Sequence, residues 1–125
     1  MFSIDIYSRT PIYLQIIDGV KQAVLLRLLS EGDQIPSVRE FSVTAGVNPN
    51  TVSKAYLELE RQKVLTGAAG KGYFVAFGAY ERLWGASLKE AKDAFLNARD
   101  RLVCNGISIE TLKQWVESIQ KEEQV

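Results

Sequence analysis

The chain contains no histidine and only one cysteine among its 125 residues. Without histidine it lacks the commonest general base and a frequent metal ligand. The single cysteine, Cys104, excludes an intramolecular disulfide framework and offers no metal-binding spacing. No serine has an activating partner at a recognisable spacing. We therefore expect no enzyme activity, no cofactor and no metal centre.

Long apolar runs and net charge are absent too. No segment approaches the roughly 18–20 apolar residues of a membrane span, and the first residues lack the basic start and apolar core of a signal peptide. A cytoplasmic protein is the expectation. Fifteen Lys and Arg balance fifteen Asp and Glu, so any attraction for nucleic acid must come from local basic side chains. Between residues 36 and 72 the basic side chains are Arg39, Lys54, Arg61, Lys63 and Lys71.

The length suits one compact domain, or one small domain with an appendage. Apolar residues at helical spacing predict a leading helix from Pro11 to about Leu29, with the proline suited to the first helical position. The turn residues 31–33 and then Pro36 cannot continue that helix.

Two short helices joined by a tight turn follow. Ser37 stands three residues before Glu40, which is the spacing of a capping box at a helix start. Gly46 is a natural left-handed stop for that helix. Asn48 can then cap a second helix, with Pro49 in its first turn.

The second of these helices has two different faces. Val52, Tyr56 and Leu59 share the face expected to pack inward, and the opposite face carries short or basic polar side chains. A helix start built from small polar residues presents a slim surface that can enter the DNA major groove. Sequence-specific DNA binding is therefore the leading hypothesis. The residues assigned to this contact are Asn48, Pro49, Asn50, Thr51, Ser53 and Lys54.

A β-hairpin is predicted next. The stretches 64–66 and 73–77 are β-prone, and the glycine-rich loop 67–72 lies between them. A phosphate-binding loop is excluded, because Leu65 and Gly72 stand where that motif needs glycine and a hydroxyl residue. Three helices with a hairpin predict a winged helix-turn-helix domain over residues 1–77, in a mainly α fold.

Residues 78–125 predict two more helices, separated at Asn105 and Gly106, with Ser108 as a cap. Their apolar residues form narrow seams at three- and four-residue spacing, and two such helices cannot bury a core alone. We expect a homodimerisation segment. Its residues are Leu88, Ala91, Phe95, Ala98, Leu102, Ile109, Leu112, Trp115, Val116 and Ile119. Phe95 and Trp115 could instead line a ligand cavity, though aromatics at this spacing more often serve packing.

Four ordered blocks, 11–16, 32–40, 46–56 and 70–75, resemble the DNA-binding domain of GntR-family bacterial transcription regulators. The Asn-Pro-Asn-Thr-Val version and the short tail are similar to the YtrA-type subfamily. The resemblance implies a homodimeric repressor on a two-fold symmetric operator, often of an ABC transporter operon. It also implies DNA contacts for the start of the first short helix, the start of the recognition helix and the wing. These positions correspond to Ser37 and Arg39, to Asn48, Pro49, Asn50, Thr51 and Ser53, and to Gly70, Lys71 and Gly72.

The chain departs from many relatives at two places. Ser53 stands where an arginine is common in the recognition helix, and Thr66–Ala69 lacks the arginines that often precede the wing glycine. These departures and the neutral charge leave a rival open, a winged-helix module that binds proteins and not DNA. For Arg39 the alternative is a surface ion pair with a nearby carboxylate. A small-molecule effector, or none, also stays open.

Overall fold

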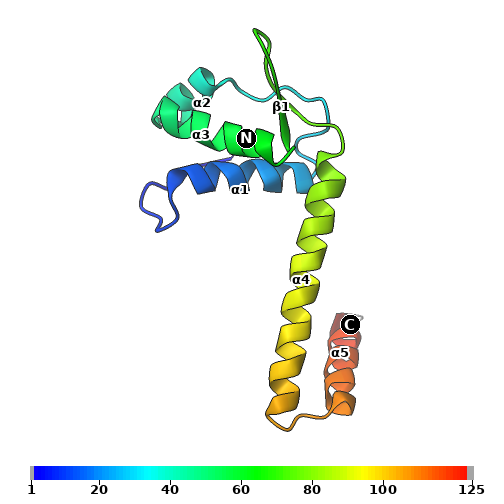
Figure 1. The fold of residues 1–125 in the computed structure, drawn as a ribbon. Helices are drawn as coiled ribbons and strands as arrows, with labels where there is room; N and C mark the ends of the chain where they lie inside the picture. The colour runs from blue at the N-terminus through cyan, green and yellow to red at the C-terminus, as the bar shows by residue number, and fades with distance from the viewer. Residues whose placement is uncertain (1, 124–125) are drawn as a thin grey trace. The chain divides into compact units, whose positions relative to one another are not determined.

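A computed structural model describes residues 2–123, with side chains through residue 120. Contacts divide the chain into one compact unit that ends at Gly85 and another that begins at Ala86. The first unit contains α1 (Ile12–Leu25), α2 (Val38–Ala45), α3 (Pro49–Arg61) and the antiparallel strands β1 (Leu65–Ala68) and β2 (Gly72–Val75). Helix α4 (Ala79–Cys104) continues into the second unit, which also contains α5 (Ile109–Glu123). The predicted winged helix-turn-helix fold is confirmed (Figure 1).

The core of the first unit lies between α1 and α3, which run side by side in Figure 1. Ile16 and Val20 from α1 are inaccessible to solvent, as are Val52, Tyr56 and Leu59 from α3. The predicted inward face of α3 is thus confirmed. Its opposite face remains available for contacts outside the domain.

The helix boundaries around the turn follow the predicted capping chemistry. The Ser37 hydroxyl accepts a hydrogen bond from the Glu40 N–H at 3.0 Å, and Gly46 adopts a left-handed φ of 68°. The Asn48 Oδ1 accepts from the Asn50 N–H at 2.8 Å. Only the serine half of the capping box forms within residues 2–120, since Glu40 makes no hydrogen bond to the Ser37 N–H there.

Two predicted boundaries were wrong. Helix α1 ends at Leu25 and not near Leu29, because Arg27 turns the chain with a φ of 61° and places its guanidinium 3.4 Å from the Tyr80 ring centroid. The hairpin strands extend into the glycine-rich stretch, since Gly67 pairs with Tyr73 and Ala68 with Gly72. The wing turn is therefore only residues 69–71.

The segment before α2 runs antiparallel along β2. The Ile35 N–H donates to the Tyr73 carbonyl at 3.0 Å, and the Val75 N–H donates to the Asp33 carbonyl at 2.8 Å. Gln34 forms an isolated bridge with Phe74. These bonds tie the wing to the chain that leads into α2, so the wing and the start of α2 are positioned together.

Tyr56 is at the centre of the first unit. Its ring centroid lies 6.4 Å from that of Phe41 on α2 and 5.1 Å from that of Tyr73 on β2. Its hydroxyl donates to the Pro36 carbonyl at 2.8 Å. Burial raises the pKa of the Tyr56 hydroxyl above its ordinary value, so it remains a hydrogen-bond donor at neutral pH.

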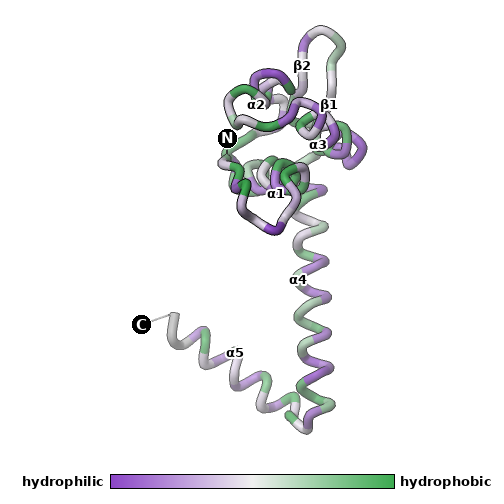
Figure 2. The backbone as a smooth tube through the Cα atoms, turned by 90° about the vertical axis from the view of Figure 1, so that its left-hand side faces the viewer, coloured by the Kyte–Doolittle hydropathy of each residue, from purple (hydrophilic) through white to green (hydrophobic). Residues whose placement is uncertain are grey.

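The second unit contrasts with the first in having no buried side chain among its described residues. Figure 2 shows hydrophobic and hydrophilic residues alternating along α4 and α5. Phe95 is 62% exposed and Val116 is 55% exposed. No helix in the described part of the chain is long and apolar enough to span a membrane.

The Tyr56→Phe substitution should destabilise the first unit by about 1–3 kcal/mol, because the Pro36 carbonyl would lose its partner inside the protein. Urea unfolding followed by circular dichroism measures the effect. Tyr7→Phe is the matched control, since Tyr7 is 90% exposed. Equal unfolding free energies for the two variants would contradict the role assigned to this hydrogen bond.

Candidate nucleic-acid interface

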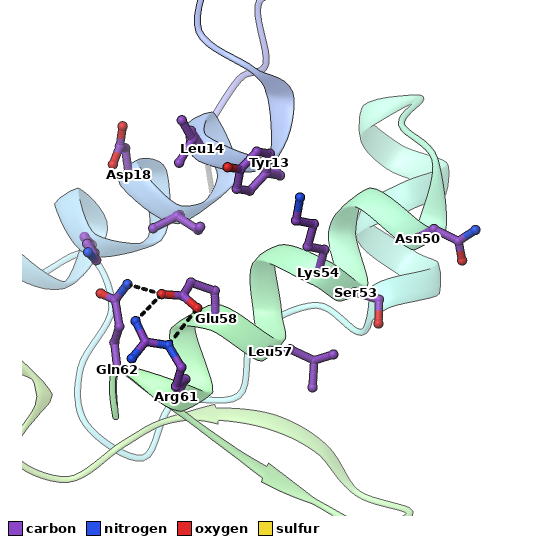
Figure 3. Close-up of a pocket in the computed structure, with 12 residues that line it drawn as sticks. Tyr13, Leu14, Asp18, Asn50, Ser53, Lys54, Leu57, Glu58, Arg61 and Gln62 are labelled. Carbon is purple, nitrogen blue, oxygen red and sulfur yellow. Dashed lines mark hydrogen bonds and ion pairs between the residues drawn. The ribbon is translucent and has the colours of Figure 1, made fainter.

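The open face of α3 carries Asn50, Ser53, Lys54 and Leu57. These positions follow the helical spacing i, i+3, i+4 and i+7, which places them on neighbouring turns of one face. Figure 3 shows Asn50, Ser53 and Leu57 pointing away from α1, and Lys54 pointing toward it. This face is opposite the buried Val52, so packing leaves it free.

Lys54 is held by an aromatic side chain from α1. Its Nζ lies 4.1 Å from the centroid of the Tyr13 ring, a cation–π distance. Tyr13 also lines the groove between α1 and α3 together with Asn50 and Ser53. The charge of Lys54 is thereby fixed at the edge of the exposed face of α3.

The last turn of α3 is different, because its arginine is already paired. The Arg61 Nε donates to Glu58 at 2.9 Å, and the Gln62 amide donates to the same carboxylate at 2.8 Å (Figure 3). These hydrogen bonds, with Arg61 first, lower the pKa of Glu58 to about 2. Glu58 is therefore ionised at neutral pH and offsets the positive charge of Arg61.

The wing turn and the start of α2 line one concavity, which includes Ser37, Gly70, Lys71 and Gly72. The Gln34 amide donates to the Lys71 carbonyl at 2.8 Å across it. Gly72 has a φ of 103°, and a Cβ there would lie 3.0 Å from the Gln34 amide nitrogen. The positive φ favours glycine at this position, and a side chain there would also displace the Gln34 amide from the Lys71 carbonyl.

The base of the wing is anchored to α3 by a carboxylate. The Gly67 N–H donates to the Glu60 Oε2 at 2.7 Å. A Cβ on Gly67 would meet that oxygen at 2.5 Å, so the absence of a side chain permits the contact. Thus the acidic Glu60, which stands close to the proposed interface, serves to position the wing.

Arg39 lies exposed in the first turn of α2. Within the residues whose side chains are described, it forms no ion pair with a carboxylate. The alternative of a surface ion pair for this arginine therefore has no support in the described structure.

Residues 12–75, which span α1 through β2, match the family described as bacterial regulatory proteins, gntR family. The chain belongs to the GntR family. Its winged helix-turn-helix is a DNA-binding domain of this family, and the expectation that the chain is not an enzyme is confirmed by its relatives, which are transcription regulators.

Three of the proteins that resemble this chain illustrate the similarity. The HTH-type transcriptional repressor YtrA of Bacillus subtilis is 36% identical over 119 residues, covering 95% of this chain and 92% of that protein. A crystal structure of a transcriptional regulator from Oenococcus oeni is 35% identical, with a TM-score of 0.80 over 96% of this chain and 99% of that one. The DNA-binding domain of AraR, solved with operator ORE1, is 27% identical, with a TM-score of 0.52 over 61% of this chain and 95% of that one.

The structure groups the predicted contact residues of this GntR-family chain in two places. Asn50, Ser53 and Lys54 line the groove between α1 and α3, whereas Ser37 and residues 70–72 line the concavity beside the wing. Asn48, Pro49 and Thr51 form the cap and first turn of α3. Whether these residues contact DNA stays a prediction.

Sequence reasoning missed four residues that shape this interface. Tyr13 orients Lys54 and Gln34 holds the wing turn, whereas Glu60 anchors the wing base and Leu57 completes the open face of α3. Gln34 is 37 residues from its partner, so no local pattern could reveal that contact. Leu57 could have been predicted from the sequence, because it follows Asn50 by seven residues and Ser53 by four, which places it on the same helical face.

The Glu60→Ala substitution should speed amide hydrogen exchange at Gly67 and its neighbours in β1, because the carboxylate that accepts the Gly67 N–H would be lost. Hydrogen exchange followed by NMR measures the effect in the free protein. Glu60→Gln, whose amide oxygen can still accept, is the matched control and should retain most of the protection. Unchanged exchange in Glu60→Ala would show that the wing base does not depend on this contact.

Proposed function

We propose that this chain is a homodimeric repressor that binds a two-fold symmetric DNA operator through α3. The observation that carries the proposal is the open and mostly polar face of α3, which lies on a helix whose other face is buried. Small side chains such as Asn50 and Ser53 permit close approach to base edges. Its relatives support this function, since YtrA is a repressor by name and the AraR domain was solved with an operator.

Each element has a separate role in the proposed complex. Residues 48–54 enter the major groove, where base edges carry a distinct pattern of donors and acceptors. Ser37 fixes the position of the protein along the DNA backbone, Arg39 contacts a base edge or a phosphate beside it, and the wing residues 70–72 touch the adjacent groove or phosphates. Backbone contacts set the register of α3, and base contacts set sequence preference.

The second unit supplies the proposed dimer interface. The predicted dimerisation residues from Phe95 onward line one apolar concavity of α4 and α5, namely Phe95, Ala98, Leu102, Ile109, Leu112, Trp115, Val116 and Ile119. Leu88 and Ala91 precede it on α4 and are exposed. A unit without buried side chains cannot be stable alone in water, and a second copy of the chain can cover these residues.

Two-fold symmetry has consequences for the operator. A dimer that places both copies of α3 on one side of the duplex requires half-sites about one helical turn apart, roughly 34–36 Å. We place the regulator in the cytoplasm with the bacterial chromosome. The resemblance to YtrA-type regulators further suggests an ABC transporter operon as the regulated gene set, which an inverted repeat upstream of such an operon would support.

The Arg39→Ala substitution should weaken binding to the operator by about 1–3 kcal/mol if Arg39 makes a bidentate base contact. Fluorescence anisotropy on the inverted repeat upstream of the protein's own gene, titrated with salt, measures the loss. Lys89→Ala is the control, because Lys89 lies on α4, outside the proposed DNA contacts and outside the predicted dimerisation residues. An equal, smaller loss on every duplex would make Arg39 a phosphate contact, and no loss would remove it from the interface.

The same titration separates the regulator from the rival module that binds protein. The neutral net charge and the arginine-free stretch Thr66–Ala69 favour the rival. Binding that is tighter on the repeat than on random DNA, and that weakens as salt rises, supports the regulator. Equal binding to the repeat and to random DNA supports the rival.

The Val116→Glu substitution should convert the dimer to a monomer, because each copy would place a carboxylate in the apolar interface. Val116 is 55% exposed in the single chain, so the fold of the protomer should tolerate the change. Sedimentation velocity measures the mass, and Gln114→Glu on another face of α5 is the matched control. A dimeric Val116→Glu protein would exclude this concavity as the interface.

A further inference from the structure

One large apolar side chain lies on the face of α3 that we propose enters the major groove. Leu57 is 55% exposed, although its neighbours on that face, Asn50, Ser53 and Lys54, are polar or charged. Figure 3 shows it on the same side of α3 as Asn50 and Ser53, pointing away from α1. Leu57 also lines the edge of the groove between α1 and α3, but it is not buried there, so packing within the chain accounts for only part of its apolar surface.

The position of Leu57 matches the reach of a helix lying in the major groove. It follows Asn50 by seven residues, Ser53 by four and Lys54 by three. In homeodomains, the recognition helix uses four side chains at this same i, i+3, i+4 and i+7 spacing to read the groove. Leu57 is the i+7 member of the set, one turn beyond Ser53.

The chemistry of the groove then identifies the contact. Only thymine presents an apolar group there, the C5-methyl, and apolar side chains are its usual partners. Ser53 and Leu57 offer no cation for bidentate recognition of guanine, which leaves this part of α3 suited to an A·T pair. We propose that Leu57 is a specificity-determining residue that contacts a thymine methyl in each half-site. The inference deepens the proposed function and rests on it.

The neighbouring arginine does not compete for this base. Arg61 lies one turn further along α3, and its guanidinium is engaged by Glu58. Lys54 is turned toward the Tyr13 ring, away from the side of the helix where Leu57 projects (Figure 3). Leu57 is therefore the terminal contact of the reading face.

The test removes the methyl group from the DNA. Duplexes enriched by the full-length protein from a random pool are remade with each thymine replaced, one at a time, by deoxyuridine. At one position in each half-site, this change should weaken wild-type binding about three- to fivefold, as expected for one methyl-sized apolar group. The Leu57→Ala protein should bind the thymine and deoxyuridine duplexes equally.

Two variants control for indirect effects. Leu57→Met keeps an apolar side chain and should retain sensitivity to deoxyuridine, whereas Leu26→Ala removes an exposed leucine outside α3 and should behave as wild type. Circular dichroism checks that the Leu57→Ala protein is folded.

Three outcomes overturn the inference. These are wild-type binding that ignores every deoxyuridine, a Leu57→Ala protein that keeps the wild-type sensitivity, and an enriched motif without thymine. In each case specific binding itself survives, and only the assignment of Leu57 is lost. A pool that yields no enriched sequence overturns the proposed function as well, which distinguishes the two failures.

Discussion

The hydrogen bond from Tyr56 to the Pro36 carbonyl connects the three elements that form the candidate interface. A buried hydroxyl is costly unless it is paired, and the Tyr56 side chain finds its acceptor immediately before α2. The same ring packs edge-on against Tyr73 of β2. One side chain of α3 thus fixes the start of α2 and the wing relative to α3.

The contacts of the carboxylates on α3 show how a chain without net charge can still present basic side chains on its surface. Glu58 is bound to Arg61 and Gln62, and Glu60 accepts the Gly67 N–H at the wing base. Both acidic side chains have structural partners inside the domain. The basic Lys54 and Lys71 have no such ion pairs among the described residues. A local positive surface can therefore exist on a chain without net charge, though with few phosphate contacts per subunit.

The sequence predicted what local chemistry determines. Helix starts at Ser37 and Asn48 depend on side chains two or three residues away, and the buried face of α3 depends on helical periodicity. Strand ends in the glycine-rich stretch were missed, because pairing across the hairpin overrides the low strand propensity of glycine. The early end of α1 was missed for a related reason, since Arg27 stacks on Tyr80, 53 residues later. Contacts between distant segments, such as that of Gln34 with Lys71, could not be predicted, because they produce no local sequence pattern.

The two units differ in what stabilises them, and this difference links association to recognition in the proposed dimer. The first unit has its own core around Ile16 and Leu59, whereas the second has no buried side chain among its described residues. In the proposed dimer a second copy of the chain buries the apolar residues of α4 and α5, so that unit would gain stability with protein concentration. Each protomer offers DNA only a few basic contacts. In the proposed dimer, joining two protomers would make the second half-site contact effectively intramolecular, and this gain would replace the affinity that a more basic domain would obtain from charge.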